Sequence, residues 1–554
     1  MRRRALLAAW LCGGMAGSAT AAPHLLPAPA TDPLSGVTLS LSTCFWDPPP
    51  TGMLALRVAV ENDGSRAREW TLHFDAAGDY GGTVTYGSAE AIQVPAGATR
   101  EFELSVPIRA SSSSMGFSST MHTVFEGPAT SDERIALFMN RHFLNSSAGE
   151  RALTPWIGMS ESLATAHWEP TKAALLLNGQ LLAGSRFDPT CLPADWRSYL
   201  GFTALALTAD EWRDLSPAPR LAIERWVARG GRLWLAGDAL GSRSLGSGTI
   251  AGLPDPRRMG QETLAEAVRA LPPINDDYQS WNLITQLGAP GFPKGLMLAF
   301  IAGFGLLVGP VNLFAFCRGA NRYRVLWTTP LLSIVASALI TAGILLHDGT
   351  GGTGLRQAVV ELLPARHEAI VLQEQLARTG LLLGSRFRTT DVVWMEPIEL
   401  TDREGARSVD RVQRTGDAFS GAWFSSRALH AQYLESVRPS RARFEISGEA
   451  AHPRVVSSLP DTLEDVYLID GKGAYWHATG VEPGRSVDLT AETEKTFQNW
   501  LSGTTPFHGP RLRRAVQPGA GMVFGGARRT TAAVATLASL TWTDRETLYV
   551  QRLD

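Results

Sequence analysis

The two longest uncharged stretches of the chain decide its architecture. Residues 296–316 read LMLAFIAGFGLLVGPVNLFAF, and residues 325–346 read VLWTTPLLSIVASALITAGILL. A helix of about 20 apolar residues crosses the ~30 Å hydrocarbon core of a bilayer, so each stretch is long enough to span one. We therefore predict a two-helix transmembrane hairpin, with the membrane lipid bilayer as its surroundings.

The connector between the two stretches is basic. It contains Arg318, Arg322 and Arg324 and no acidic residue. Cytoplasmic loops are enriched in Lys and Arg, so the connector is expected in the cytoplasm and both flanks outside it. The predicted localisation is a bacterial inner membrane, crossed twice, with the large domains in the periplasm.

The N-terminus predicts export independently of the hairpin. Residues 2–4 are arginines, an apolar run follows over residues 5–11, and small residues follow up to Ala21, which is the layout of a secretory signal peptide. The exported parts contain Cys44 and Cys191, and an oxidising compartment permits disulfides. A Cys44–Cys191 disulfide and two separate thiols both remain open, because sequence gives neither pairing nor distance.

Length, charge and histidine spacing restrict the function classes. The chain has 554 residues, which exceeds one hydrophobic core and predicts about three folded units. The formal net charge of −2 gives no large basic field, so no nucleic-acid partner is expected. The eleven histidines never recur at the spacing of a metal-binding helix, and we expect neither a metal site nor a cofactor.

The segment from residue 36 to 142 has the pattern of a β-sandwich. Apolar and polar residues alternate in several short runs separated by turn residues, which favours an immunoglobulin-like arrangement of strands. The predicted strands are residues 37–41, 54–60, 70–74 and 102–106.

The period changes over residues 153–275, where strand and helix patterns alternate. Such alternation predicts a parallel, doubly wound sheet. Predicted strands are 155–162, 173–178, the start of 202–212 and 231–238, and an amphipathic helix is predicted over 220–231.

A glycine-flanked turn follows the last of these strands. It reads Gly237-Asp238-Ala239-Leu240-Gly241, of the form G-x-A-x-G. The block resembles the class I glutamine amidotransferase-like, flavodoxin-like fold, in which a G-x-C-x-G elbow presents a nucleophilic cysteine. The resemblance implies that Ala239 stands at the nucleophile position. A methyl group cannot attack a carbonyl, so the resemblance implies a pseudoenzyme and not an enzyme.

In a doubly wound fold, ligands bind at the carboxyl ends of the strands. We expect a non-catalytic envelope protein, a scaffold or receptor for another envelope protein or a transporter component. Two alternatives use the same crevice: an exported hydrolase acting through Ser160, Asp238 and Ser242, and a small-ligand sensor. The candidate crevice residues are Ser160, Gly237, Asp238, Ala239, Gly241 and Ser242.

The chain after the hairpin returns to strand patterns. Residues 349–354 (GTGGTG) have the composition of a flexible exit linker, and residues 356–554 predict a β-rich exported domain that ends in a strand pair over 539–553. The order of segments, with Gly309-Pro310-x-Asn312 in the first span, resembles a group of uncharacterised bacterial membrane-anchored envelope proteins. The predicted fold class is a multidomain α+β membrane protein. Its segments are 1–21 (signal peptide), 36–142 (sandwich), 153–275 (amidotransferase-like), 296–316 and 325–346 (transmembrane helices) and 356–554 (β-rich).

Overall fold

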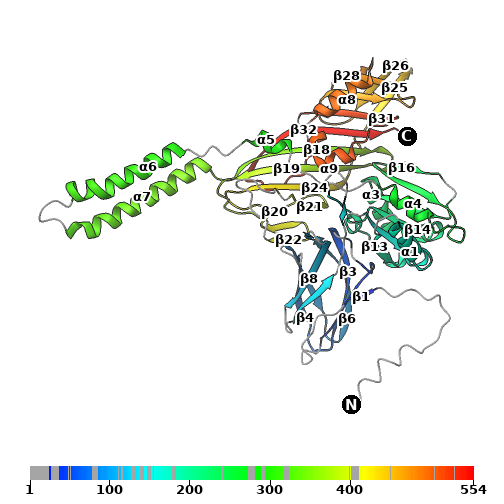
Figure 1. Ribbon diagram of the computed structural model, residues 1–554, viewed down its shortest axis with the longest axis horizontal. Coiled ribbons are helices and arrows are strands. Elements are labelled where there is room, and N and C mark those ends of the chain that lie inside the picture. Colours follow the sequence, from blue (N-terminus) through cyan, green and yellow to red (C-terminus); the bar gives the residue numbers. More distant parts are fainter. Residues whose placement is uncertain are drawn as a thin grey trace, which may run out of the picture.

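The computed structural model shows a mixed α/β protein that is rich in strands and contains several sheets, with a helical hairpin projecting from its body (Figure 1). The predicted signal peptide, residues 1–21, lies outside the described residues. The structure describes residues 24–26, 37–47, 49, 51–77, 85–109, 111–113, 116–126, 131–137, 143–145, 151–153, 155–177, 182–238, 241–271, 281–288, 294–316, 323–398, 400, 411–449, 451–504, 506–528 and 531–553.

Two sheets form the N-terminal part of the body. Their inward side chains, such as Leu56 and Val58 from one sheet and Leu72 and Phe74 from the other, share one hydrophobic core. All four strands predicted here are present, because one face of each is buried and the alternation of residues is clear. The first sheet has the order β1 (His24–Leu26), β2 (Val37–Thr43), β3 (Thr51–Asn62), β6 (Ala98–Arg109); the second contains β4 (Arg68–Ala77), β5 (Thr85–Val94), β7 (Ser111–Ser113), β8 (Gly116–Glu126) and β9 (Ser131–Leu137).

The second sheet is completed by chain from beyond the hairpin. Strand β22 (Arg411–Thr415) pairs in parallel with β5, with Arg411 opposite Thr85, and β23 (Ala418–Gly421) and β20 (Phe387–Arg388) follow it. The sheet therefore crosses the expected division between residues 36–142 and 356–554.

The α/β unit has the sheet order β13-β12-β14-β15-β17-β16, in which the first five strands are parallel and β16 is an antiparallel edge. The prediction of a strand over 173–178 is wrong, because this apolar run is the end of helix α1. The strand that follows α1 and pairs with β12 is β13. A short apolar run fits either structure. The elements are β12 (Trp156–Ser160), α1 (Glu161–Leu176), β13 (Ala183–Phe187), β14 (Ala204–Thr208), α2 (Ala209–Asp214), α3 (Pro217–Ala228), β15 (Arg232–Ala236), β16 (Arg243–Leu245), β17 (Gly248–Leu253) and α4 (Thr263–Arg269).

A nine-stranded sheet dominates the C-terminal part. The predicted linker at 349–354 is wrong, because β18 begins at Gly352 and pairs there with β19 and β32. The predicted terminal strand pair is also wrong, since β32 is one continuous strand. The strand order of this sheet is β21 (Val393–Pro397), β24 (Leu429–Pro439), β19 (Glu368–Thr379), β18 (Gly352–Leu363), β32 (Leu540–Arg552), β31 (Met522–Ala527), β27 (Leu463–Ile469), β28 (Tyr475–Val481), β30 (Thr490–Glu492). A separate three-stranded sheet contains β25 (Phe444–Glu449), β26 (His452–Ser457) and β29 (Ser486–Asp488). The helices of this part are α8 (Glu494–Gly503) and α9 (Pro510–Ala515).

The hairpin consists of α6 (Lys294–Leu306), which continues as the π-helical segment η3 (Leu307–Phe316), and α7 (Val325–Asp348). The π-helical part contains Pro310, which has no N–H to donate to an α-helical bond. Among the described helices, only α7 has a stretch long and apolar enough to cross a membrane, Val325–Gly343; the apolar part of the partner helix is shorter. The Asn312 side-chain amide donates a hydrogen bond to Thr329 Oγ1 at 3.0 Å, which joins the two helices.

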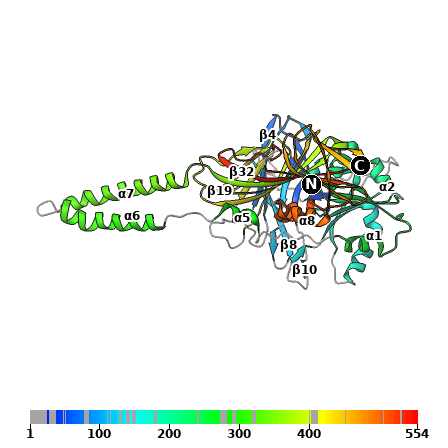
Figure 2. The same ribbon diagram turned by 90° about the horizontal axis from the view of Figure 1, so that it is seen from above.

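Both helices leave the body at the same end of the nine-stranded sheet (Figures 1 and 2). Helix α5 (Asn282–Leu287) precedes α6, and its Leu283 shares a core with Leu355 of β18. Arg378 of β19 donates a hydrogen bond to the Gly288 carbonyl at 2.5 Å, which fixes the chain before it enters the hairpin. Of the arginines predicted to set the topology, Arg324 is exposed just before α7, and Arg318 and Arg322 lie outside the described residues.

Candidate functional site

The candidate crevice lies at the carboxyl ends of the parallel strands of the α/β unit. In the sheet, Met159 of β12 is opposite Ala206 of β14, and Thr208 of β14 is opposite Ala236 of β15. Ser160 and Gly237 therefore lie at the carboxyl ends of β12 and β15, with β14 between these two strands. The strand order reverses between β12 and β14, and such a reversal is where open α/β sheets bind ligands.

The polar side chains at this reversal are bound to one another. Ser160 is fully buried, and its Oγ lies 3.3 Å from Ser162 Oγ. Ser162 Oγ donates to Glu211 Oε1 at 2.6 Å, and Glu211 Oε2 accepts from the Thr208 N–H at 2.8 Å. The Glu211 N–H in turn donates to Thr208 Oγ1, which completes a capping box at the start of α2. These polar groups therefore stabilise the local fold.

Among the described residues, Ser160 has no basic partner that would activate it as a nucleophile. Its described side-chain partner is the Ser162 hydroxyl. The nearest histidine along the chain, His167, lies seven residues further on, near the middle of α1, roughly 10 Å along the helix axis. The His167 Nε2 atom is buried without a hydrogen-bond partner in the described part of the chain. A serine nucleophile needs a base within hydrogen-bond reach, and this arrangement does not supply one.

The remaining predicted crevice residues are spread along the sheet. Gly237 is exposed with a φ of +87°, and its N–H donates to the Leu253 carbonyl at 3.0 Å, so a turn follows β15 as expected. Asp238 is half-buried beside it, and Ala239 lies outside the described residues. Gly241 and Ser242 are exposed and lead into β16, the outer edge strand.

The structure thus brings Ser160 and Gly237 to the carboxyl ends of β12 and β15 and leaves Ser242 away from Ser160. Four strand spacings separate β12 from β16, which is about 19 Å. Sequence reasoning missed Ser162, Thr208 and Glu211, although the T-x-x-E pattern of a capping box is readable at residues 208–211. Across the described residues, no group of three or more His, Cys, Asp or Glu side chains could hold a metal ion.

A buried ion pair fixes the α/β unit to the nine-stranded sheet. The Arg229 guanidinium, just after α3, contacts the Glu435 carboxylate of β24, and both side chains are nearly inaccessible to solvent. Arg229 also lies over the Trp196 ring at 5.1 Å, and the Tyr433 hydroxyl donates to Glu435 Oε1 at 2.5 Å. Burial lowers the pKa of Arg229 to about 10. Removal of one partner would leave the other charged and buried.

Further polar contacts cross the same junction. Arg225 pairs with Glu368 at 2.5 Å, and Arg366 pairs with Glu224 at 2.7 Å. Ser247 Oγ donates to Glu361 Oε2 at 2.7 Å, and burial raises the pKa of Glu361 to about 7. The α/β unit is therefore docked on the sheet through several specific side chains.

The two cysteines of the exported parts lie together between the sandwich and the α/β unit. Cys44 and Cys191 are buried free thiols, and their Sγ atoms lie 3.2 Å and 3.3 Å from the same Asp188 carbonyl oxygen. Burial raises the pKa of the Cys44 thiol, whereas a hydrogen bond with Cys44 lowers the pKa of Cys191.

The chain resembles known proteins only weakly. No protein-family model matches the chain, and neither does any curated protein. A structure of red sea bream transglutaminase is 14% identical over 20% of this chain and 18% of that chain, with a TM-score of 0.14. A yeast delta-COP-I μ-homology domain complexed with a Dsl1 WxWxV peptide is 11% identical over 37% of this chain and 96% of that chain, with a TM-score of 0.18. A structure of Bacteroides uniformis β-glucuronidase is 14% identical over 36% of this chain and 22% of that chain, with a TM-score of 0.16. Similarities at these TM-scores define neither the fold nor the function of this chain.

Proposed function

We propose that the chain is a non-catalytic envelope protein, anchored in the bacterial inner membrane by its hairpin, whose periplasmic body is a scaffold or receptor for another envelope protein or a transporter component. The observation that carries the proposal is that the two flanks of the hairpin fold into one body. Residues before the hairpin pair with residues after it, as in the Thr85–Arg411 strand pairing and the Arg229–Glu435 ion pair.

This shared body supports a two-pass topology. If α7 crossed the bilayer alone, Thr85 and Arg411 would lie on opposite sides and could not pair. In the proposed topology the helix formed by α6 and η3 brings the chain back across the membrane, although its apolar part is shorter than that of α7. The basic connector then faces the cytoplasm, in agreement with the signal-like N-terminus that exports the first flank.

The arrangement of the crevice supports a binding role over catalysis. The sheet order β13-β12-β14-β15-β17 is the order 2-1-3-4-5 of flavodoxin-like folds, which favours the amidotransferase-like assignment of the unit. In that assignment Ala239 replaces the nucleophile, and the hydroxyl of Ser160 is bound to Ser162. The sandwich is then an immunoglobulin-like presentation module, a role common for such domains.

Photocrosslinking in living cells tests the proposal. A photoreactive amino acid is placed at Trp46 or Leu177, two exposed apolar positions on the body, with exposed Arg257 as a control position on a charged turn. We expect a discrete adduct of one mass at an apolar position, unchanged when Ser160→Ala is added. Absence of any discrete adduct at either apolar position contradicts the scaffold role. A hydrolytic activity that Ser160→Ala abolishes would support the hydrolase instead.

A further inference from the structure

An open groove lies at the end of the nine-stranded sheet from which the hairpin emerges. It has a volume of about 660 Å³. One wall is formed by residues 384–388, which end in the short strand β20, and the other is the segment 536–539 that leads into β32. None of the residues that line it is acidic, and two of them, Arg386 and Arg388, are exposed arginines.

Backbone hydrogen bonds place this groove beside the root of α7. The Leu381 N–H donates to the Gly349 carbonyl at 3.1 Å, and the Gly351 N–H donates to the Leu381 carbonyl at 2.9 Å. On the other wall, Leu540 is opposite Gly352 in the sheet. Arg386 follows Leu381 by five residues, so its backbone lies within about 18 Å of Leu381, which is itself bonded to the residue after α7.

The end of α7 falls at the depth of lipid headgroups in the proposed topology. The uncharged stretch ends at Leu346, and Gly349 follows about 5 Å further along the chain at the helical rise. The headgroup layer on each side of the hydrocarbon core is roughly 6 Å thick. In that topology Gly349, at the root of α7, lies at the depth of the outer-leaflet phosphates, and the groove lies beside this root.

The side chains around the groove match a lipid surface. Leu383 is 89% exposed, the largest exposed fraction among the large apolar side chains of the described residues. Neither Arg386 nor Arg388 forms an ion pair or a side-chain hydrogen bond with a described residue. Guanidinium groups bind phosphate oxygens through paired N–H donors, and an exposed leucine beside them can enter the acyl boundary.

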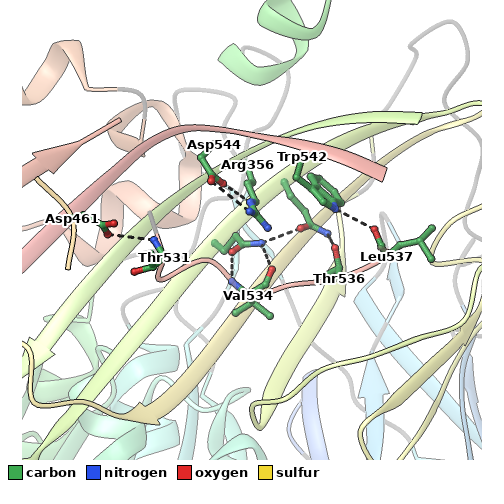
Figure 3. A network of polar contacts seen from close by, with 10 residues as sticks. Arg356, Asp461, Thr531, Val534, Thr536, Leu537, Trp542 and Asp544 are labelled. Carbon is green, nitrogen blue, oxygen red and sulfur yellow. Dashed lines mark hydrogen bonds and ion pairs between the residues drawn. The ribbon is translucent and has the colours of Figure 1, made fainter. Parts of the chain in front are cut away.

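The second wall of the groove is held rigidly. The segment before β32 crosses the face of the sheet, where the Val534 N–H donates to Gln373 Oε1 at 2.8 Å and Gln373 Nε2 donates to the Val534 carbonyl at 3.2 Å (Figure 3). Gln375 Nε2 reaches Thr536 Oγ1 at 3.5 Å, and Trp542 Nε1 donates to the Leu537 carbonyl at 3.3 Å. Residues 536 and 537 are thus held in place by side chains of the sheet.

We propose that this groove binds the headgroup of an anionic phospholipid, with Arg386 and Arg388 on the phosphate and Leu383 in the acyl boundary. The inference rests on the proposed membrane anchoring and extends it to a specific lipid contact. A headgroup held at the root of α7 sets the body against the bilayer surface.

Full-length protein in nanodiscs tests this binding. Ala538, which is exposed in the groove, is replaced by cysteine and labelled with an environment-sensitive fluorophore in a Cys317→Ser background. We expect its emission to shift to shorter wavelength as phosphatidylglycerol is added to phosphatidylcholine. The double variant Arg386→Gln with Arg388→Gln should weaken the apparent affinity for phosphatidylglycerol about thirty-fold, because each arginine near an anionic membrane surface strengthens binding about five-fold.

The control changes two exposed arginines of the α/β unit, Arg257→Gln with Arg258→Gln, and should leave the response unchanged. Equal responses in the two double variants, or no dependence on phosphatidylglycerol, would overturn the inference. A response of the detergent-solubilised protein to inorganic phosphate alone, equal to that with lipid, would also overturn it. Carbonate extraction of the same protein from cell membranes reports separately on anchoring: extraction contradicts the proposed function, whereas retention without a lipid response contradicts only the headgroup site.

Discussion

Replacing Glu435 with glutamine should loosen the junction between the α/β unit and the nine-stranded sheet. The side chains of Arg229 and Glu435 are only 11% and 6% exposed, so the variant leaves the guanidinium charged and buried without its counter-charge. Breaking a buried pair in this way costs about 3–5 kcal/mol. For a cooperative unit of ordinary domain size, this corresponds to a fall in Tm on the order of 10 °C.

The assay is thermal unfolding of the full-length protein in detergent, followed by tryptophan fluorescence, since Trp196 and Trp226 are buried near the pair. The matched control is Glu445→Gln, whose partner Arg443 lies in an ion pair with side chains 48% and 53% exposed. That pair should contribute less than about 1 kcal/mol. The combined variant Arg229→Met with Glu435→Leu should recover most of the lost stability, because no buried charge remains. Equal Tm values for Glu435→Gln and Glu445→Gln would refute the docking argument.

Three further predictions concern the junction, the thiols and the crevice. The pKa of Glu361 is about 7 in the folded protein against an ordinary value of 4.5, so the folded state keeps a proton that the unfolded state releases between these values. The free energy of unfolding should therefore fall as pH rises through this window, by up to about 1.4 kcal/mol per pH unit. Glu361→Gln should make Tm depend less on pH between pH 5 and 8. A variant whose Tm changes with pH as steeply as that of the original protein would contradict the raised pKa of Glu361. A disulfide oxidant should join Cys44 and Cys191 and close a loop of about 150 residues. The lost entropy of the unfolded chain should then raise the free energy of unfolding by about 5 kcal/mol. Mass mapping of a non-reduced digest detects the bond, and two alkylated thiols after oxidation would contradict it. Glu211→Ala removes the capping box and should cost about 1 kcal/mol in urea unfolding, whereas Glu211→Gln should retain most of it; equal losses would count against the capping role.

The strands whose buried and exposed residues alternate were predictable, as were the short and almost fully buried strands β12, β14 and β15. The buried polar residues of the long strand β19 were not. In β3 the buried residues largely alternate with exposed ones in its second half, and its core was predicted. In β19 nearly every residue is buried, including the consecutive Gln373, Glu374 and Gln375. Glu374 accepts hydrogen bonds from Gln357 Nε2 and the Arg511 N–H, and the glutamines bind the segment that crosses the sheet. Sequence alternation cannot reveal such partners, and those from Arg511 and from the crossing segment lie more than a hundred positions away along the chain.

The same limit applies to the site. The resemblance and the sheet pattern led to Ser160 and Gly237, which do lie at the carboxyl ends of parallel strands. The pairing of β22 with β5, and the ion pairs that dock the α/β unit, join parts of the chain separated by the hairpin. No local pattern encodes these contacts, so the sequence predicted separate domains where the structure shows one body.

Labelling of single cysteines with a membrane-impermeant maleimide tests the two-pass anchoring most directly. The exposed positions Arg257, before the hairpin, and Arg485, after it, are each replaced by cysteine in a Cys317→Ser background. Tyr323, which is exposed just before α7, is replaced in the same way. In cells with a permeabilised outer membrane, cysteines at 257 and 485 should react, and a cysteine at 323 should react only after the inner membrane is opened. Reaction at 323 in cells with a closed inner membrane, or protection at 485 with reaction at 257, would contradict the account.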